Sequence, residues 1–175
     1  MGEFDGKTAI ITGGTQGLGE EVAKNFAEHG ASKIVITGRN QDRGATVYNA
    51  QSKMGCDALF VSADLRSVDG SRAIVTAARS HFDQIDHLVN CAADTRRGNI
   101  VDTSEQLLDD IFSVNFRAPF FIMQEVVRWM IEKNTKGSIA NVLSTSYHCG
   151  QPFLSAYSAS KAALATLTKN TAFAL

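Results

Sequence analysis

The stretch Thr12-Gly13-Gly14-Thr15-Gln16-Gly17-Leu18-Gly19 joins an apolar run, residues 8–12, to a segment of helical length, residues 17–29. Glycines here let the backbone turn sharply, let phosphate oxygens approach the helix N-terminus, and let the helix pack closely on the strand. The alternative is a glycine-rich turn without a ligand, which the strand before it and the amphipathic helix after it disfavour. The turn therefore predicts a dinucleotide-binding site. The expected contacts are Gly13, Thr15, Gln16, Gly17, Leu18 and Gly19.

The same order of strand and helix repeats along the chain. Short apolar runs predict five buried strands, at residues 8–12, 34–37, 58–62, 87–90 and 138–143. Stretches of helical length follow them, at residues 17–29, 41–54, 68–82, 105–133 and 155–175. The fourth should break near residues 115–119, because proline is tolerated only in the first turn of a helix. Strict alternation predicts an α/β fold with a doubly wound parallel sheet, in which ligands bind beyond the carboxyl ends of the strands.

The composition narrows the class of protein. A chain of 175 residues predicts a single domain over residues 1–175. Its 17 Lys and Arg against 18 Asp and Glu, without a block of like charges, argue against a nucleic-acid partner. Polar residues interrupt the longest apolar region, residues 111–131, which excludes a membrane span. The three cysteines form no CxxC and the four histidines show no ligand spacing, so we expect free thiols, no metal and a cytoplasmic protein.

The residues after the second predicted strand bear on the choice of cofactor. A site that prefers NAD would present an acid there to the ribose 2'-hydroxyl. This chain has Thr37-Gly38-Arg39-Asn40, and a guanidinium can hold a 2'-phosphate through two charge-assisted hydrogen bonds. Such bonds contribute about 1.5–3 kcal/mol, or roughly a 10- to 100-fold preference. We therefore expect NADP rather than NAD, with Arg39 and Asn40 at the cofactor; the alternative is a solvated arginine at a helix start.

A second motif, Tyr157-Ser158-Ala159-Ser160-Lys161, predicts acid–base chemistry. Residues four apart share one face of a helix, so Tyr157 and Lys161 would present a phenol and an ammonium to the same site. A nearby positive charge lowers the phenol pKa from its usual value near ~10, as proton transfer to or from an alcohol oxygen requires. An ordinary exposed Tyr/Lys pair is the alternative.

Taken together, the TGxxxGxG spacing at residues 13, 17 and 19 and the YSASK motif resemble the short-chain dehydrogenase/reductase family over Lys7–Leu175. The resemblance implies a Rossmann fold and an NADP(H)-dependent oxidoreductase acting on a small carbonyl or secondary alcohol. It implies that Ser144 orients the substrate oxygen and that Tyr157 is the general acid/base. It further implies that Lys161 lowers the tyrosine pKa and binds the nicotinamide ribose, and that Asn115 holds a water linked to the lysine.

The resemblance also extends the expected cofactor site. Ala63-Asp64-Leu65 is similar to the family segment that meets the adenine ring, although an Asp after a strand is often only a cap. Residues 88–93 resemble the segment that ends in NNAG, with Cys91 and Ala93 as departures. The cofactor contacts implied in this way are Asp64, Leu65, Asn90, Ala92, Tyr157 and Lys161.

Family members continue through a further strand with a Pro-Gly turn, a substrate lid and a last strand. Both prolines here, Pro119 and Pro152, precede the final predicted helix, so we expect a C-terminally truncated or shortened domain that lacks the last strands. A non-catalytic nucleotide-binding or interaction module, or an inactive fragment of such an enzyme, is the alternative function. By resemblance alone, the long helices at residues 105–133 and from 155 onward imply a homo-oligomer.

Overall fold

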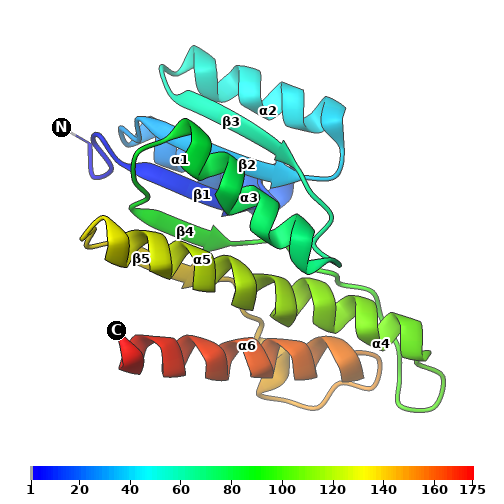
Figure 1. Ribbon diagram of the computed structural model, residues 1–175. Coiled ribbons are helices and arrows are strands. Elements are labelled where there is room, and N and C mark those ends of the chain that lie inside the picture. Colours follow the sequence, from blue (N-terminus) through cyan, green and yellow to red (C-terminus); the bar gives the residue numbers. More distant parts are fainter. Residues whose placement is uncertain (1) are drawn as a thin grey trace.

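In the computed structural model, which describes residues 2–175, five parallel strands form one sheet (Figure 1). The strands are β1 (Thr8–Thr12), β2 (Lys33–Gly38), β3 (Asp57–Ser62), β4 (His87–Asn90) and β5 (Ser138–Asn141). Their order in the sheet is β3-β2-β1-β4-β5, so the chain moves outward from β1 to β3 and then crosses to the other side. The predicted doubly wound sheet is confirmed.

Six α-helices among residues 2–175 connect and cover these strands. They are α1 (Gly17–Glu28), α2 (Gln41–Lys53), α3 (Val68–His81), α4 (Glu105–Phe112), α5 (Ala118–Glu132) and α6 (Ser155–Ala174). Side-chain oxygens of Asn40, Ser67 and Ser104 accept a hydrogen bond from the third N–H of α2, α3 and α4, which fixes where each helix begins. Gln16, before α1, makes no such bond, so the N-terminus of α1 carries no side-chain cap. None of the helices in residues 2–175 is long and apolar enough to span a membrane.

Two apolar cores lie on opposite faces of the sheet because side chains alternate along each strand. Ile10 points to one face, where it joins Ile74 of α3 and Trp129 of α5. Its neighbour Ile11 points to the other face and joins Phe26 of α1. Both faces of the central strand are therefore buried, as the uninterrupted apolar run of β1 predicts.

The break predicted near residues 115–119 has a different form from the one expected. A single π-helical turn, Ser113–Arg117, joins α4 directly to α5, so the helix continues through this region. Pro119 lies in the first turn of α5, directly after the π-turn, and it does not end the helix. The extra residue of the π-turn places Asn115 in the interior, fully buried.

The fifth strand is shorter than predicted. β5 ends at Asn141 instead of residue 143. Val142 still donates its N–H to the carbonyl of Asn90, at 3.0 Å. The chain then leaves the sheet, and Ser144 caps a 3-10 turn, Thr145–Tyr147. The side chain of Ser144 therefore lies just beyond the sheet edge, at the carboxyl end of the strand.

Candidate active site

A cavity of about 890 Å³ opens at the carboxyl ends of β1 to β4. Its walls come from the four segments that follow these strands, with Val114 of the π-turn added. Ten of the predicted cofactor residues line it: Gly13, Thr15, Gln16, Gly17, Leu18, Gly19, Arg39, Asp64, Leu65 and Ala92. Four others do not reach the wall: Asn40, Asn90, Tyr157 and Lys161. The glycine turn and the three following loops thus meet around one space, as the strand order requires.

The backbone of the glycine turn fits a bound pyrophosphate. Gly13 has φ +67°, and a Cβ there would lie 2.9 Å from the Cα of Ala92. A Cβ on Gly19 would lie 2.3 Å from the carbonyl oxygen of Gly13, so neither position accepts a side chain. Gly17 also has a positive φ, +54°, but a Cβ there would meet nothing within 4 Å. Open space beside Gly17 and an uncapped helix start leave backbone N–H groups available to an anion.

Arginines gather around the end of the cavity formed by β2 and β3. Arg39 is exposed on the wall, while the Asn40 side chain caps α2 by accepting from the N–H of Arg43. The guanidinium of Arg43 donates to Oε1 of Gln16, which brings a second cation to the glycine turn. Sequence reasoning missed Arg43, although its place three residues after a capping residue puts it in the first turn of α2.

Asp64 lies on the same part of the wall and is already paired. Arg66 donates from Nη2 to Oδ2 of Asp64 at 2.6 Å and from its backbone N–H to Oδ1 at 3.0 Å. These bonds from Arg66 lower the pKa of Asp64 to about 2. The carboxylate charge at this end of the cavity is therefore balanced by a neighbouring guanidinium. Arg66 was also missed from the sequence, where it stands two residues after the acid.

The segment after β4 forms the opposite wall. The N–H of Ala92 donates to Oγ1 of Thr12 at 3.2 Å, which ties this segment to the start of the glycine turn. Asn90 donates instead across the sheet, to Oδ1 of Asn141 at 2.8 Å, and its own Oδ1 is buried without a partner among the described residues. Cys91 places a thiol in the wall; burial raises the pKa of Cys91, and the charge of Lys161 opposes that rise.

Tyr157 and Lys161 lie in the first two turns of α6. The Nζ of Lys161 is 6.0 Å from the centroid of the Tyr157 ring, and it donates to the carbonyl of Val142 at 2.7 Å. Lys161 is 1% exposed, and burial lowers the pKa of its ammonium group. The Ser144 hydroxyl, two residues after Val142, donates to Oγ of Ser146 at 2.9 Å and accepts from the N–H of Ser146 at 3.2 Å. Lys161 thus joins the segment that follows β5 to the start of α6.

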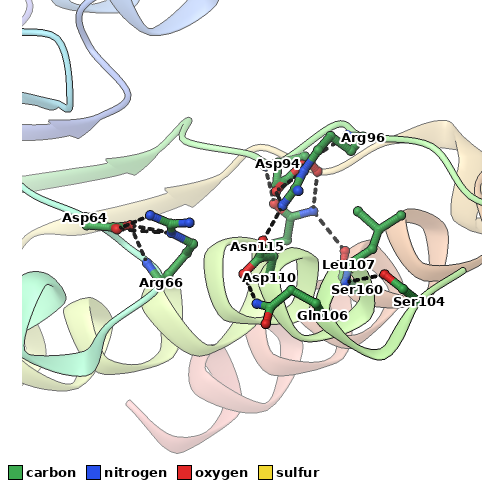
Figure 2. A network of polar contacts seen from close by, with 10 residues as sticks. All are labelled: Asp64, Arg66, Asp94, Arg96, Ser104, Gln106, Leu107, Asp110, Asn115 and Ser160. Carbon is green, nitrogen blue, oxygen red and sulfur yellow. Dashed lines mark hydrogen bonds and ion pairs between the residues drawn. The ribbon is translucent and has the colours of Figure 1, made fainter.

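Asn115 connects three elements through its side chain, as Figure 2 shows. Its Oδ1 accepts from the N–H of Asp94 at 2.7 Å, and its Nδ2 donates to the carbonyl of Asp94 and to Oγ of Ser160, each at 3.0 Å. The amide therefore bridges the segment after β4 and helix α6, and all its hydrogen-bonding atoms have protein partners. Ser160, within the YSASK motif, was not singled out from the sequence.

Within residues 2–175, no group of three or more His, Cys, Asp or Glu is placed to hold a metal ion. The three cysteines there are all free.

Comparison with known proteins decides the family. A family model described as short chain dehydrogenase matches residues 7–175. This chain belongs to the short-chain dehydrogenase family. Curated proteins similar to it include an uncharacterized oxidoreductase of Thermotoga maritima, 36% identical over 97% of this chain and 66% of the relative. A 3beta-hydroxysteroid dehydrogenase of Mediterraneibacter gnavus is also 36% identical, over 97% of this chain and 60% of the relative. The chain thus spans less than two thirds of the length of these relatives.

Solved short-chain dehydrogenases share the fold closely. A short chain dehydrogenase/reductase from Burkholderia phymatum, in complex with NAD, superimposes with a TM-score of 0.93 at 27% identity, covering 100% of this chain and 62% of that one. A metagenomic short-chain oxidoreductase in complex with NADP gives a TM-score of 0.92 at 26% identity, covering 98% and 77%. The Rossmann-type sheet predicted from the sequence is therefore the fold of this family.

Proposed function

We propose that this chain binds NADP(H) and transfers hydride between the nicotinamide and a small carbonyl or secondary alcohol, with Tyr157 as general acid/base. The observation that carries the proposal is that Lys161, four residues after Tyr157 on α6, donates to the carbonyl of Val142, two residues before Ser144. Lys161 is close enough to Cys91, a wall residue, for their charges to affect each other's pKa. Asn115 also donates to the carbonyl of Asp94, a wall residue, and to Ser160, whose hydroxyl donates to the Tyr157 carbonyl, which links the start of α6 to the wall.

Each of these side chains has a definite role in the proposal. The bound nicotinamide supplies or accepts the hydride. The Tyr157 phenol gives a proton to the carbonyl oxygen during reduction and takes it back during oxidation. The Lys161 ammonium stabilises the phenolate form, and its bond to the Val142 carbonyl keeps Nζ in place. The Ser144 hydroxyl donates to the substrate oxygen and so orients it.

The charges at the β2 and β3 end of the cavity support a preference for NADP. Arg39 is exposed there, Arg43 contacts Gln16, and the Asp64 carboxylate is balanced by Arg66. A 2'-phosphate there would therefore meet the exposed guanidinium of Arg39, with Arg43 beside it. We expect NADPH to bind about 10- to 100-fold more tightly than NADH, from the strength of hydrogen bonds between charged groups.

Titration of the purified chain with each cofactor, followed by nicotinamide fluorescence, measures this preference. Arg39→Ala should weaken NADPH binding towards that of NADH and leave NADH binding unchanged. Equal affinities in the unmodified chain would contradict the NADP preference. Binding of neither cofactor would contradict the cofactor site as a whole.

The catalytic part of the proposal has its own test. Tyr157→Phe keeps the ring and removes the hydroxyl, so it should lower turnover of aldehyde and ketone substrates by at least about 100-fold while cofactor affinity stays the same. The measurement is the decrease in NADPH absorbance with a panel of carbonyl compounds. A variant as active as the unmodified chain would exclude Tyr157 as the acid/base. Cofactor binding without turnover in either protein would instead favour the nucleotide-binding module.

A further inference from the structure

Two turns on the cavity wall have the same internal geometry. In Asp64-Leu65-Arg66 and in Asp94-Thr95-Arg96, the arginine N–H donates to Oδ1 of the aspartate at 3.0 Å. In both turns the arginine Nη2 also donates to Oδ2 at 2.6 Å. Figure 2 shows one difference between them: Arg96 Nη2 also reaches Oδ2 of Asp110, at 2.7 Å.

This extra contact fastens the segment after β4 to helix α4. Asp110 is buried, and its Oδ1 accepts from Nε2 of Gln106 one turn earlier, at 2.8 Å. Hydrogen bonds from Arg96 lower the pKa of both Asp94 and Asp110, so both carboxylates are charged at neutral pH. A guanidinium can serve two carboxylates because its donors are fixed in a planar fork, which a lysine lacks.

The same segment is held a second time through its backbone. Asn115 binds both the N–H and the carbonyl of Asp94, and it also donates to Ser160. Ser160 is fully buried and passes the connection on, because its hydroxyl donates to the carbonyl of Tyr157 at 2.7 Å. Asp94 is thus fixed by its side chain and by both its peptide groups, and the chain of bonds ends at the residue that carries the phenol.

We propose that Arg96, Asp110 and Ser160 are positioning residues that hold the wall segment, residues 91–94, in a fixed place relative to the start of α6. The part of this inference that concerns cofactor affinity rests on the proposed function. Arg39 lies after β2, whereas this cluster lies after β4, next to Asn115 and α6. Loss of the cluster therefore weakens NADPH and NADH binding alike, unlike loss of Arg39.

The test compares four variants with one control. Arg96→Gln removes the charge, Arg96→Lys keeps the charge without the fork, Asp110→Asn removes one of the two acids, and Ser160→Ala removes the link to α6. The control is Arg79→Gln, which breaks an exposed ion pair with Glu132 between α3 and α5, away from the cavity. The readouts are amide hydrogen exchange at Asp94 and the dissociation constants of NADPH and NADH.

We expect Arg96→Gln to speed exchange of the Asp94 N–H and to weaken both cofactors by about 3- to 30-fold, with the ratio of the two constants unchanged. Arg96→Lys and Asp110→Asn should fall between this variant and the unmodified chain. Ser160→Ala should also speed exchange of the Asp94 N–H, because the Asn115 amide that accepts from this N–H loses its contact with α6. Arg79→Gln should change none of these quantities.

Two outcomes would overturn the inference. The first is that all four variants match Arg79→Gln in the exchange rate at Asp94 and in both dissociation constants. This result would show that the cluster does not hold the wall segment. A changed NADPH to NADH ratio in Arg96→Gln would show that Arg96 acts on the 2'-phosphate directly. If the unmodified chain binds neither cofactor, the proposed function fails, while exchange at Asp94 still decides whether the cluster holds the wall segment. Asp110→Asn keeps a similar shape and covers the case in which Arg96→Gln does not fold.

Discussion

Asp86 joins three strands at the amino-terminal edge of the sheet. Its N–H donates to the carbonyl of Thr8 at 3.0 Å, and its carbonyl accepts from the N–H of Ser138 at 2.9 Å. Its carboxylate accepts from the Thr8 N–H at 3.0 Å and from Nζ of Lys7 at 3.2 Å. The residue is 1% exposed, so the Thr8 N–H depends on this carboxylate.

Asp86→Ala should therefore lower the free energy of unfolding by about 1–3 kcal/mol, the cost of leaving a buried donor without an acceptor. Urea unfolding at pH 7 measures this change. The control is Asp83→Ala, an exposed acid three residues earlier, which should change stability by less than about 0.5 kcal/mol. Equal effects of the two substitutions would show that the Thr8 bond contributes nothing.

The same carboxylate should make stability depend on pH. Burial raises the pKa of Asp86, but hydrogen bonds from Thr8, Lys7 and Gln84 outweigh burial and the net pKa is lowered. A lowered folded-state pKa gives stability that is fully present above the unfolded value near ~4 and lost as the pH falls through the folded value. Asp86→Asn should lose less stability than the unmodified chain between pH 5 and pH 3, as followed by urea unfolding. Parallel losses in the two proteins would contradict this assignment.

At the scale of elements, the turn between β1 and α1 can be compared with the turn between α2 and β3. Gly17 has φ +54° and Gly55 has φ +87°, and a Cβ at either would meet nothing within 4 Å. Alanine at either position should cost about 1–2 kcal/mol from backbone strain alone. Only Gly17 lines the cavity, so only Gly17→Ala should also weaken NADPH binding. Unfolding and cofactor titration of both variants measure the difference, and equal cofactor affinities would place the pyrophosphate elsewhere.

The elements differ in how far the sequence specifies them. Strand and helix order followed from apolar runs and from the glycine turn, because those signals are local. The π-turn could not be predicted from the sequence. Pro119 indicates only the first turn of a helix, whereas tertiary packing decides how α4 and α5 join. The partners of Asn115 were also beyond prediction, since they come from residues 94 and 160. Arg96 could be matched to Asp110 only once α4 had been placed beside the wall.

At the scale of the whole molecule, a bound cofactor should stabilise the fold. Four strands contribute segments to the cavity, so a ligand there bridges the β1–β2–β3 half to β4. At NADPH concentrations of 100 times the dissociation constant, the free energy of unfolding should rise by about 2.7 kcal/mol. For a chain of this size that corresponds to an increase in Tm of roughly 5–10 °C. Thermal unfolding with and without NADPH measures this increase in Tm, and an unchanged Tm would contradict cofactor binding.

The homo-oligomer and the cytoplasmic location expected from the sequence stay predictions.

The order of the elements along the chain also fixes the order in which the ribosome makes the site residues. The glycine turn, Arg39 and Arg66 all belong to the β1–β2–β3 half, whereas Tyr157 and Lys161 lie on α6. From Arg66 to Lys161 the ribosome must add 95 residues (161 minus 66), which takes roughly 5–20 s at ordinary synthesis rates. The part of the chain that would hold the adenosine phosphates is therefore made well before the group that would move the proton, and Asn115 is made between them.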